Sequence, residues 1–343
     1  MPNFNIIGNG FDLYHGLPSS YYYFACYLLS VDEKVYFDLA DMYGFAPGLI
    51  HHFHEEFDAG IDNIGYWREF EKKLGYLSSE WVENSLLDDL GFDYTEAVDL
   101  PIEVPNHVKT IRKYLSDWIR TTVDTEQNFK IIGSLLGENK VQFSPLDAFL
   151  SFNYTHTLEK VYNTTHVMHI HGECNPNIEC SDLVIGHGND NAICKMESDI
   201  AELMPYYYEQ PARNRIREYQ FEMNVLKNLR KPVKNCMAKL ELFANKMEIP
   251  DTICVYGFSL SDVDAPYIYW IRRKWPSCKW RFSYYSDKDK DSIQHMAKSL
   301  CLEPYQYEMF QFANQMSSEI EQRIVEANKI NIYPTLEQLR HTT

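Results

Sequence analysis

The sequence predicts an α/β fold in which a mostly parallel sheet carries helices on both faces. Short apolar runs bounded by turn residues alternate with helical stretches from about residue 147 onward. The chain also opens directly on an apolar run, Phe4–Ile7, which leads into a glycine pair. Parallel neighbours require a crossover connection, so strands that alternate with helices favour a parallel sheet. With 343 residues, of which 45% are hydrophobic, the chain is long enough for a packed core.

The strands are predicted where a few apolar residues are flanked by glycine or polar turn residues. They are Phe4–Ile7, Ala148–Phe152, Val167–Ile170, Leu183–Ile185, Thr252–Tyr256, Trp280–Tyr285 and Tyr305–Tyr307. Two stretches between them, residues 20–137 and 197–247, have mainly helical patterns. Because no linker rich in Pro, Gly or Ser borders these stretches, we expect large helical insertions into one α/β core spanning residues 1–343.

Three more helices are predicted after the second insertion. Ser261-x-x-Asp264 has the spacing of a capping box and predicts a helix beginning shortly after Ser259. Asp289–Leu300 and Ser317–Lys329 are the other two predicted helices.

Charge and cysteine usage exclude several classes of protein. The formal net charge is -17, and the densest basic run, Lys227–Lys234, is predicted to be a solvated helix face, so no nucleic-acid partner is expected. No basic-then-apolar leader and no apolar run of about 18 residues occurs, so neither secretion nor a membrane partner is expected. The eight scattered cysteines contain no CxxC pair, which favours a reduced, cytoplasmic protein.

Glycine or polar residues follow five successive predicted strands. In chain order they are Gly8-Asn9-Gly10, Asn153-Tyr154-Thr155, His171-Gly172, Gly186-His187-Gly188 and Gly257-Phe258-Ser259. Any one of them alone is typical of an ordinary turn. In a parallel sheet, however, these strand ends share one edge, where ligands bind at the topological switch point. Glycines let the backbone approach a pyrophosphate, so the set predicts a Rossmann-like site for an adenine dinucleotide such as NAD.

Several single residues have two interpretations. Asn153 can cap the following helix or hold a ribose hydroxyl or a water. His169 and His171 flank Ile170 and are predicted on one face of their strand, His171 as a general base and His169 as a structural residue or a metal ligand. Their spacing matches no zinc pattern. Glu71 shares a helix stripe with Trp67, and it lies at the edge of that stripe or binds a ribose or a cation.

Taken in order, these segments resemble the bacteriophage abortive infection family AbiH. The matching segments are IIGNGFDLYHGLPSSY (Ile6–Tyr21), WREFEKKL (Trp67–Leu74), LSFNYTHTLEKVY (Leu150–Tyr162), HIHGE (His169–Glu173), LVIGHG (Leu183–Gly188) and VYGFSLSDVDAPY (Val255–Tyr267). That family is in turn similar to the sirtuin-like superfamily. The resemblance implies a sirtuin-like core, with Asn153 and His171 as the catalytic pair and NAD as substrate.

The resemblance also implies which residues surround the dinucleotide. They are Gly8, Asn9, Gly10, Phe11, Asp12, Glu71, Tyr154, Thr155, Gly172, Gly186, His187, Gly257, Ser259, Asp262 and Asp264. Sirtuin deacylases carry a four-cysteine zinc ribbon and an Asp-Phe-Arg motif in the first loop, and this chain has neither, so deacylation is not expected. Bacterial defence proteins with the same core and no zinc ribbon degrade NAD.

The sequence and the resemblance together predict a nicotinamide-releasing NAD hydrolase that acts in defence against phage and needs no metal. Two alternatives stay open. One is a sensor that binds NAD or ADP-ribose without catalysis. The other is a metal-dependent hydrolase using His169, His171 and His187. The resemblance implies that infection supplies the trigger, through a phage-derived factor or partner protein, and the aromatics of the insertions favour a homo-oligomer.

Overall fold

Six parallel strands form one sheet in the described part of the chain, and this confirms the predicted α/β fold with a Rossmann-like sheet. The structure, a computed structural model, describes residues 2–43, 70–90, 107–137, 140–174, 183–259 and 263–330. The strand order is β3-β2-β1-β4-β5-β6. The strands are β1 (Asn3–Ile7), β2 (Ala148–Ser151), β3 (Val167–His169), β4 (Thr252–Tyr256), β5 (Lys279–Tyr284) and β6 (Tyr307–Gln311). Along the chain, β2 and β3 are added on one side of β1, and β4, β5 and β6 are then added on its other side. The topological switch point therefore lies between β1 and β4.

The strand predicted at Tyr305–Tyr307 begins only at Tyr307, in β6, because residues 305 and 306 form a turn, and one other predicted strand was wrong. Residues Leu183–Ile185 form no ladder, and only an isolated bridge between His187 and Arg230 follows them. Leu183 and Ile185 are nevertheless buried, at 3% and 1% exposure. Their apolar character therefore reflects a buried connecting segment, in which the Val184 amide donates to the His171 carbonyl at 2.8 Å.

By its contacts the chain divides into two units. The sheet unit comprises Met1–Phe24, Arg112–Val184 and Pro232–Ile332, and the helical unit comprises Ala25–Ile111, Ile185–Lys231 and Tyr333–Thr343. Both predicted insertions, residues 20–137 and 197–247, contribute residues to both units.

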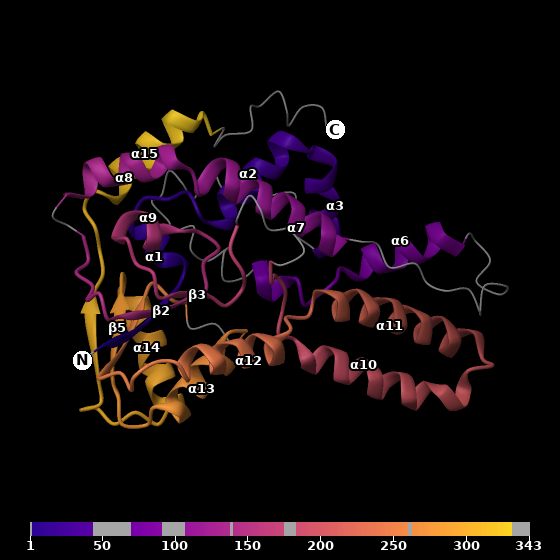
Figure 1. Cartoon of the computed structure of the whole chain (residues 1–343). Coiled ribbons are helices and arrows are strands. Elements are labelled where there is room, and N and C mark those ends of the chain that lie inside the picture. The colour runs from indigo at the N-terminus through magenta and orange to yellow at the C-terminus, as the bar shows by residue number, and fades with distance from the viewer. Residues whose placement is uncertain are drawn as a thin grey trace. The chain divides into compact units, whose positions relative to one another are not determined.

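Alternation along the strands supplies two apolar faces in the sheet unit. Phe4, Ile6, Leu150, Ile253 and Val255 face one core, which is closed by α12 (Val233–Ala244), α13 (Ala265–Lys274) and α14 (Asp287–Ser299). Ile7, Phe149, Cys254 and Tyr256 face the other core, with α1 (Asn9–Tyr14) and α9 (Thr157–Tyr162). Figure 1 shows these two groups of helices on opposite sides of the sheet. Burial on both faces explains why four successive residues of β1 and of β4 are buried, and why β4 is apolar from Ile253 to Tyr256.

The sheet unit also has helices between residues 112 and 136 and one helix near the end of its described residues. They are α8 (Glu126–Leu136), α15 (Ser317–Asn328) and the π-helix Ile119–Val123, which continues α7 (His107–Trp118). The helices predicted at Asp289–Leu300 and Ser317–Lys329 are confirmed as α14 and α15, each within two residues. The predicted capping box was wrong, because α13 begins directly after Asp264, its N-cap. Ser261 lies outside the described residues.

The helical unit contains antiparallel helices with a small core of their own. Its elements are α2 (Tyr21–Val31, from residue 25), α3 (Glu33–Tyr43), α6 (Ser79–Leu90), α10 (Asp190–Leu203), the short 3-10 helix η4 (Met204–Tyr206) and α11 (Gln210–Leu229). Ile193 and Met196 of α10 pack on Leu226 of α11, and Trp81 stacks on Phe221. In the described segments no helix has both the length and the apolar character that crossing a membrane requires.

Candidate functional site

The turns after β1 and β4 touch each other at the switch point of the sheet. The Gly8 amide donates to the Tyr256 carbonyl at 3.0 Å, and the Gly10 amide donates to the Gly257 carbonyl at 2.8 Å. Gly257 has a φ of +55°, which side chains rarely adopt. The two predicted glycine turns are therefore joined backbone to backbone at the edge where ligands bind in sheets of this kind.

This contact gives the glycines a packing reason. A Cβ on Gly8 would lie 2.5 Å from the Phe258 Cα, and one on Gly10 would lie 2.7 Å from the Gly257 Cα. A Cβ on Gly257 would lie 2.3 Å from the Gly10 carbonyl carbon and the Phe11 nitrogen. Close packing of the two turns thus requires glycine at all three positions, with or without a ligand.

Asn153 follows β2 and ties its end to the turn after β1. Its Nδ2 donates to the Gly8 carbonyl at 3.0 Å, and the residue is only 7% exposed. The interpretation as a helix cap was wrong, because α9 begins after His156. The side chain instead crosses from one strand end to the next.

His169 holds the main chain of Asn153 from the next strand. Its Nδ1 lies 2.8 Å from the Asn153 carbonyl oxygen and its Nε2 lies 3.0 Å from Oε1 of Glu159. Burial lowers the pKa of His169, but the hydrogen bond to Glu159, the charge of Glu159 and the contact with the Asn153 carbonyl together outweigh burial, so the pKa is raised. A polar chain from Glu159 through His169, Asn153 and Gly8 to Tyr256 therefore crosses the carboxyl ends of β3, β2, β1 and β4.

His171 lies in different surroundings from His169, and their predicted common face was wrong. β3 ends at His169, and Ile170 and His171 form a turn. The His171 ring contacts Phe152 and Tyr267, and its Nε2 lies 3.5 Å from Oδ1 of Asp264. His171 and Asp264 are 2% and 7% exposed, so the pair is nearly enclosed.

Asp12 is a buried carboxyl group beside these strand ends. It is 1% exposed and accepts hydrogen bonds from Thr155 Oγ1 at 2.6 Å and Thr157 Oγ1 at 2.7 Å. Burial raises the pKa of Asp12 to about 6, although both threonine hydroxyls oppose the rise. Asp12 is therefore positioned by the segment after β2, as Asn153 is by the turn after β1.

Three of the other predicted binding residues of this unit, Phe11, Tyr154 and Gly172, have structural roles. Phe11 is fully buried and contacts Phe312 and Tyr256. The Tyr154 hydroxyl donates to the Val184 carbonyl at 2.9 Å, and Gly172 has a φ of +86° in the turn after β3. Asn9 opens α1 and is partly exposed, as is Ser259, whereas Asp262 lies outside the described residues.

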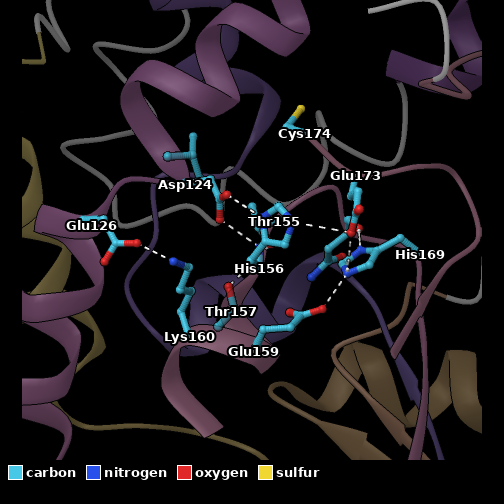
Figure 2. A network of polar contacts seen from close by, with 12 residues as sticks. Asp124, Glu126, Thr155, His156, Thr157, Glu159, Lys160, His169, Glu173 and Cys174 are labelled. Atoms are coloured by element: carbon cyan, nitrogen blue, oxygen red, sulfur yellow. Dashed lines mark hydrogen bonds and ion pairs between the residues drawn. The ribbon is translucent and has the colours of Figure 1, made fainter. Parts of the chain in front are cut away.

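A second set of histidine–carboxylate contacts lies beside this chain, and we did not predict it from the sequence. His156 Nδ1 lies 2.6 Å from Asp124 Oδ2, and its Nε2 lies 3.4 Å from Glu173 Oε2. Glu173 also lies 3.9 Å from His169 Nε2, so it faces both rings, as Figure 2 shows. The hydrogen bond with Asp124 raises the pKa of His156 to about 9. The ring is therefore positively charged at neutral pH.

The His156–Asp124 pair predicts a specific pH dependence of stability. The pKa of His156 is raised from 6.5 to about 9, so its contribution to the free energy of unfolding is complete below about pH 6.5 and lost as pH rises through about 9. We expect wild type to exceed Asp124→Asn most below pH 6.5, with the difference shrinking above pH 9. Urea unfolding of both proteins across this range measures it, and a constant difference would show that Asp124 does not raise the pKa of His156.

Three predicted binding residues, Glu71, Gly186 and His187, belong to the helical unit. Glu71 Oε2 lies 2.9 Å from Nζ of Lys231, whose side chain is fully buried. Lys231 thus departs from the solvated face predicted for its basic run. His187 is also buried, and its ring nitrogens contact the Leu226 carbonyl at 2.9 Å and the Asn189 amide at 3.0 Å.

Gly186 in the same unit is required by packing. A Cβ there would lie 1.9 Å from the Leu229 carbonyl oxygen. These contacts connect the segment before α10 with the end of α11.

Across the described residues, no group of three or more His, Cys, Asp or Glu side chains could hold a metal ion. Both ring nitrogens of His169 are also engaged, which removes support from a metal site made with that residue.

Comparison with known protein families gives a match over most of the chain. A family model described as bacteriophage abortive infection AbiH matches residues 4–284, well over half of the chain. The matched range includes β1 to β5 and all the site residues described above. No curated protein and no solved structure gives a significant match.

Proposed function

The chain belongs to the AbiH family of bacteriophage abortive infection proteins, and from that premise we propose that it hydrolyses NAD in defence against phage. The observation that carries this proposal is the meeting of the β1 and β4 turns at the switch point, with Asn153 bonded to Gly8. Dinucleotides bind at this point of a Rossmann-type sheet. A role in abortive infection follows from the family, and NAD is the ligand class that the sheet topology favours.

The proposed reaction breaks the bond between the nicotinamide nitrogen and C1′ of the ribose. Nicotinamide leaves as a neutral molecule with the bonding electron pair, and a water oxygen bonds to C1′. The products are nicotinamide, ADP-ribose and a proton. In this proposal His171 accepts that proton from the attacking water, Asp264 orients and stabilises the charged ring, and Asn153 positions the ribose or the water.

The burial of Asn153 and His171 is compatible with an effector that is inactive at rest. Asn153 and His171 are 7% and 2% exposed, so a ligand reaches them only after neighbouring side chains move. Unchecked NAD hydrolysis would kill the host, so such an enzyme needs a closed ground state. We therefore propose that an infection-derived factor opens the site.

The proposal is tested by incubating NAD with full-length protein purified from uninfected and from phage-infected cells. We expect nicotinamide release by wild type, greatest with protein from infected cells. We expect about a hundredfold less with Asn153→Ala, because the ribose or water is then misplaced, and a misplacement of about 1 Å costs about that factor. The control His295→Gln changes an exposed ring on α14 and is expected to match wild type.

Two results would overturn the hydrolase. If NAD stays intact with wild type from both sources while calorimetry shows that it binds, the protein is a non-catalytic sensor. If NAD neither binds nor reacts, the dinucleotide is the wrong ligand class and only the fold and the family assignment stand.

A further inference from the structure

A buried arginine on α11 has no counter-ion among the residues that the structure describes. Arg217 is 5% exposed, and its Nη1 has no hydrogen-bond partner in that part of the chain. A guanidinium stays charged at any physiological pH, so burial does not neutralise this side chain. A buried charge without a partner is costly, and an anion beside Arg217 would therefore stabilise it.

Two neighbouring side chains share this face of α11. Arg213 and Asn214 precede Arg217 by four and three residues, the spacings at which side chains of a helix lie next to each other. Arg213 Nε and Asn214 Oδ1 are also buried atoms without a hydrogen-bond partner in the described segments. Buried polar atoms are normally paired, so three unpaired ones on adjacent side chains indicate a site for a ligand. We call Arg213, Asn214 and Arg217 the α11 polar patch.

The α11 polar patch lies on the side of α11 that packs against α6. Phe221, one turn after Arg217, stacks on Trp81 of α6 with ring centroids 5.6 Å apart. Figure 1 shows α6 beside α11. Aromatic rings at one end of the patch exclude water, and hydrogen bonds to a charged group are stronger where water is excluded.

The acids near α11 are occupied or exposed. Arg215 is two residues from both arginines of the patch and so lies on the other side of the helix, where it pairs with Glu218 at 2.5 Å. Burial raises the pKa of Glu222, and Arg215 opposes the rise, so Glu222 belongs to that side too. The other acids with described side chains on α6 and at the start of α11 are exposed: Glu80, Glu83 and Glu209. Within the described residues, none of these acids forms an ion pair with the patch.

We propose that the α11 polar patch binds a phosphate group that has a hydroxyl hydrogen on it or beside it. The planar guanidinium groups of Arg213 and Arg217 match the oxygens of a phosphate, to which each can donate hydrogen bonds. Asn214 Oδ1 is an acceptor and needs a donor. Hydrogen phosphate supplies this donor from its own P–OH group, and a sugar phosphate supplies it from a ribose hydroxyl. This site does not depend on the proposed NAD hydrolysis, and its test needs no turnover.

Calorimetry of the full chain in phosphate-free buffer at constant ionic strength tests the ligand class. Inorganic phosphate, sulfate and ribose 5-phosphate are titrated separately at slightly acidic pH. We expect one phosphate per chain and about tenfold weaker binding of sulfate, which has the same shape but no hydrogen for Asn214. Tighter binding of ribose 5-phosphate than of phosphate identifies an ester as the ligand, and the reverse order identifies free phosphate. Absence of phosphate binding, or equal affinity for sulfate, overturns the proposal.

Replacement of single arginines tests the position of the site. Arg217→Gln should weaken phosphate binding at least about tenfold, because it removes a charge-assisted hydrogen bond. Arg215→Gln is the matched control, since it makes the same change of charge on the same helix but on the opposite side, and it should bind phosphate as wild type does. If both variants lose the same affinity, general attraction to positive charge explains the binding and the patch is not the site.

Asn214→Asp tests the patch without removing a buried arginine. The carboxylate has the shape of the amide and supplies a counter-ion to Arg213 and Arg217 from within the chain. We therefore expect a higher melting temperature than wild type in phosphate-free buffer, together with loss of phosphate binding. Wild type should approach that stability only when phosphate is added. If Asn214→Asp binds phosphate as wild type does, the proposal is wrong.

Discussion

Replacement of His171 by glutamine is expected to lower the rate of nicotinamide release by about 10²–10⁴-fold, the usual effect of removing a positioned base. Glutamine keeps a polar group of similar length between Phe152 and Tyr267 but cannot accept the proton. Because the lost interaction forms only as water attacks, kcat should fall while KM stays close to the wild-type value. Initial rates over a range of NAD concentrations measure the two constants separately.

Two companion variants separate catalysis from loss of a buried ring. Asp264→Asn keeps the imidazole but removes the carboxylate 3.5 Å away, so it should lower kcat less than His171→Gln does. His15→Gln is the matched control, because His15 is fully buried and burial lowers its pKa to about 4, which keeps it neutral. It should reduce stability and leave kcat unchanged. Equal losses of kcat in all three would mean that His171 acts only through folding.

The strands of the sheet centre were predictable because sequence and burial agree there. β4 is apolar at every position after Thr252, β1 is apolar apart from Asn3 and the buried Asn5, and both end at glycine turns, as expected for strands covered on both faces. Leu183–Ile185 has the same signature without forming a strand. A run of apolar residues indicates that a segment is buried. A strand also needs a neighbouring strand with which to form hydrogen bonds, and the local sequence does not indicate whether such a neighbour is present.

The candidate site was predictable in part, for a related reason. Asn153 and His171 stand out because they follow strands, and parallel strand ends share one edge. The face toward which the His171 ring points was not predictable, because it depends on where β3 ends, and β3 ends at His169, two residues before His171.

Contacts between distant segments were the hardest to predict. The His156–Asp124 pair joins residues 32 apart, and Glu71 meets Lys231 across 160 residues. Local spacing carries no information about such pairs. The motif NYTHTLE does contain His156 and Glu159, so the alternation of polar groups after β2 was the one available signal.

Replacement of Gly257 by alanine is expected to cost roughly 2–5 kcal/mol, a large part of the 5–15 kcal/mol that stabilises a typical domain. At φ +55° a side chain adds about 1–2 kcal/mol of backbone strain. The new methyl group would also lie 2.3 Å from two backbone atoms of the turn after β1, and such overlap typically costs about 1–3 kcal/mol. Urea unfolding without ligand measures the change.

Gly133→Ala is the control with the opposite expected sign. Gly133 lies inside α8, and a Cβ added there would have open space within 4 Å, so alanine should stabilise by about 0.5–1 kcal/mol through helix propensity. If Gly257→Ala were as stable as wild type, the turns after β1 and β4 would not be in contact, and the switch-point site would lose its main support. If the predicted loss occurs without NAD, packing alone accounts for this glycine, and inactivity of the variant says nothing about a pyrophosphate contact. Dinucleotide binding must therefore be judged from His171, whose ring lies against Phe152, Tyr267 and Asp264, because the Asn153 side chain itself holds the turn after β1 at Gly8.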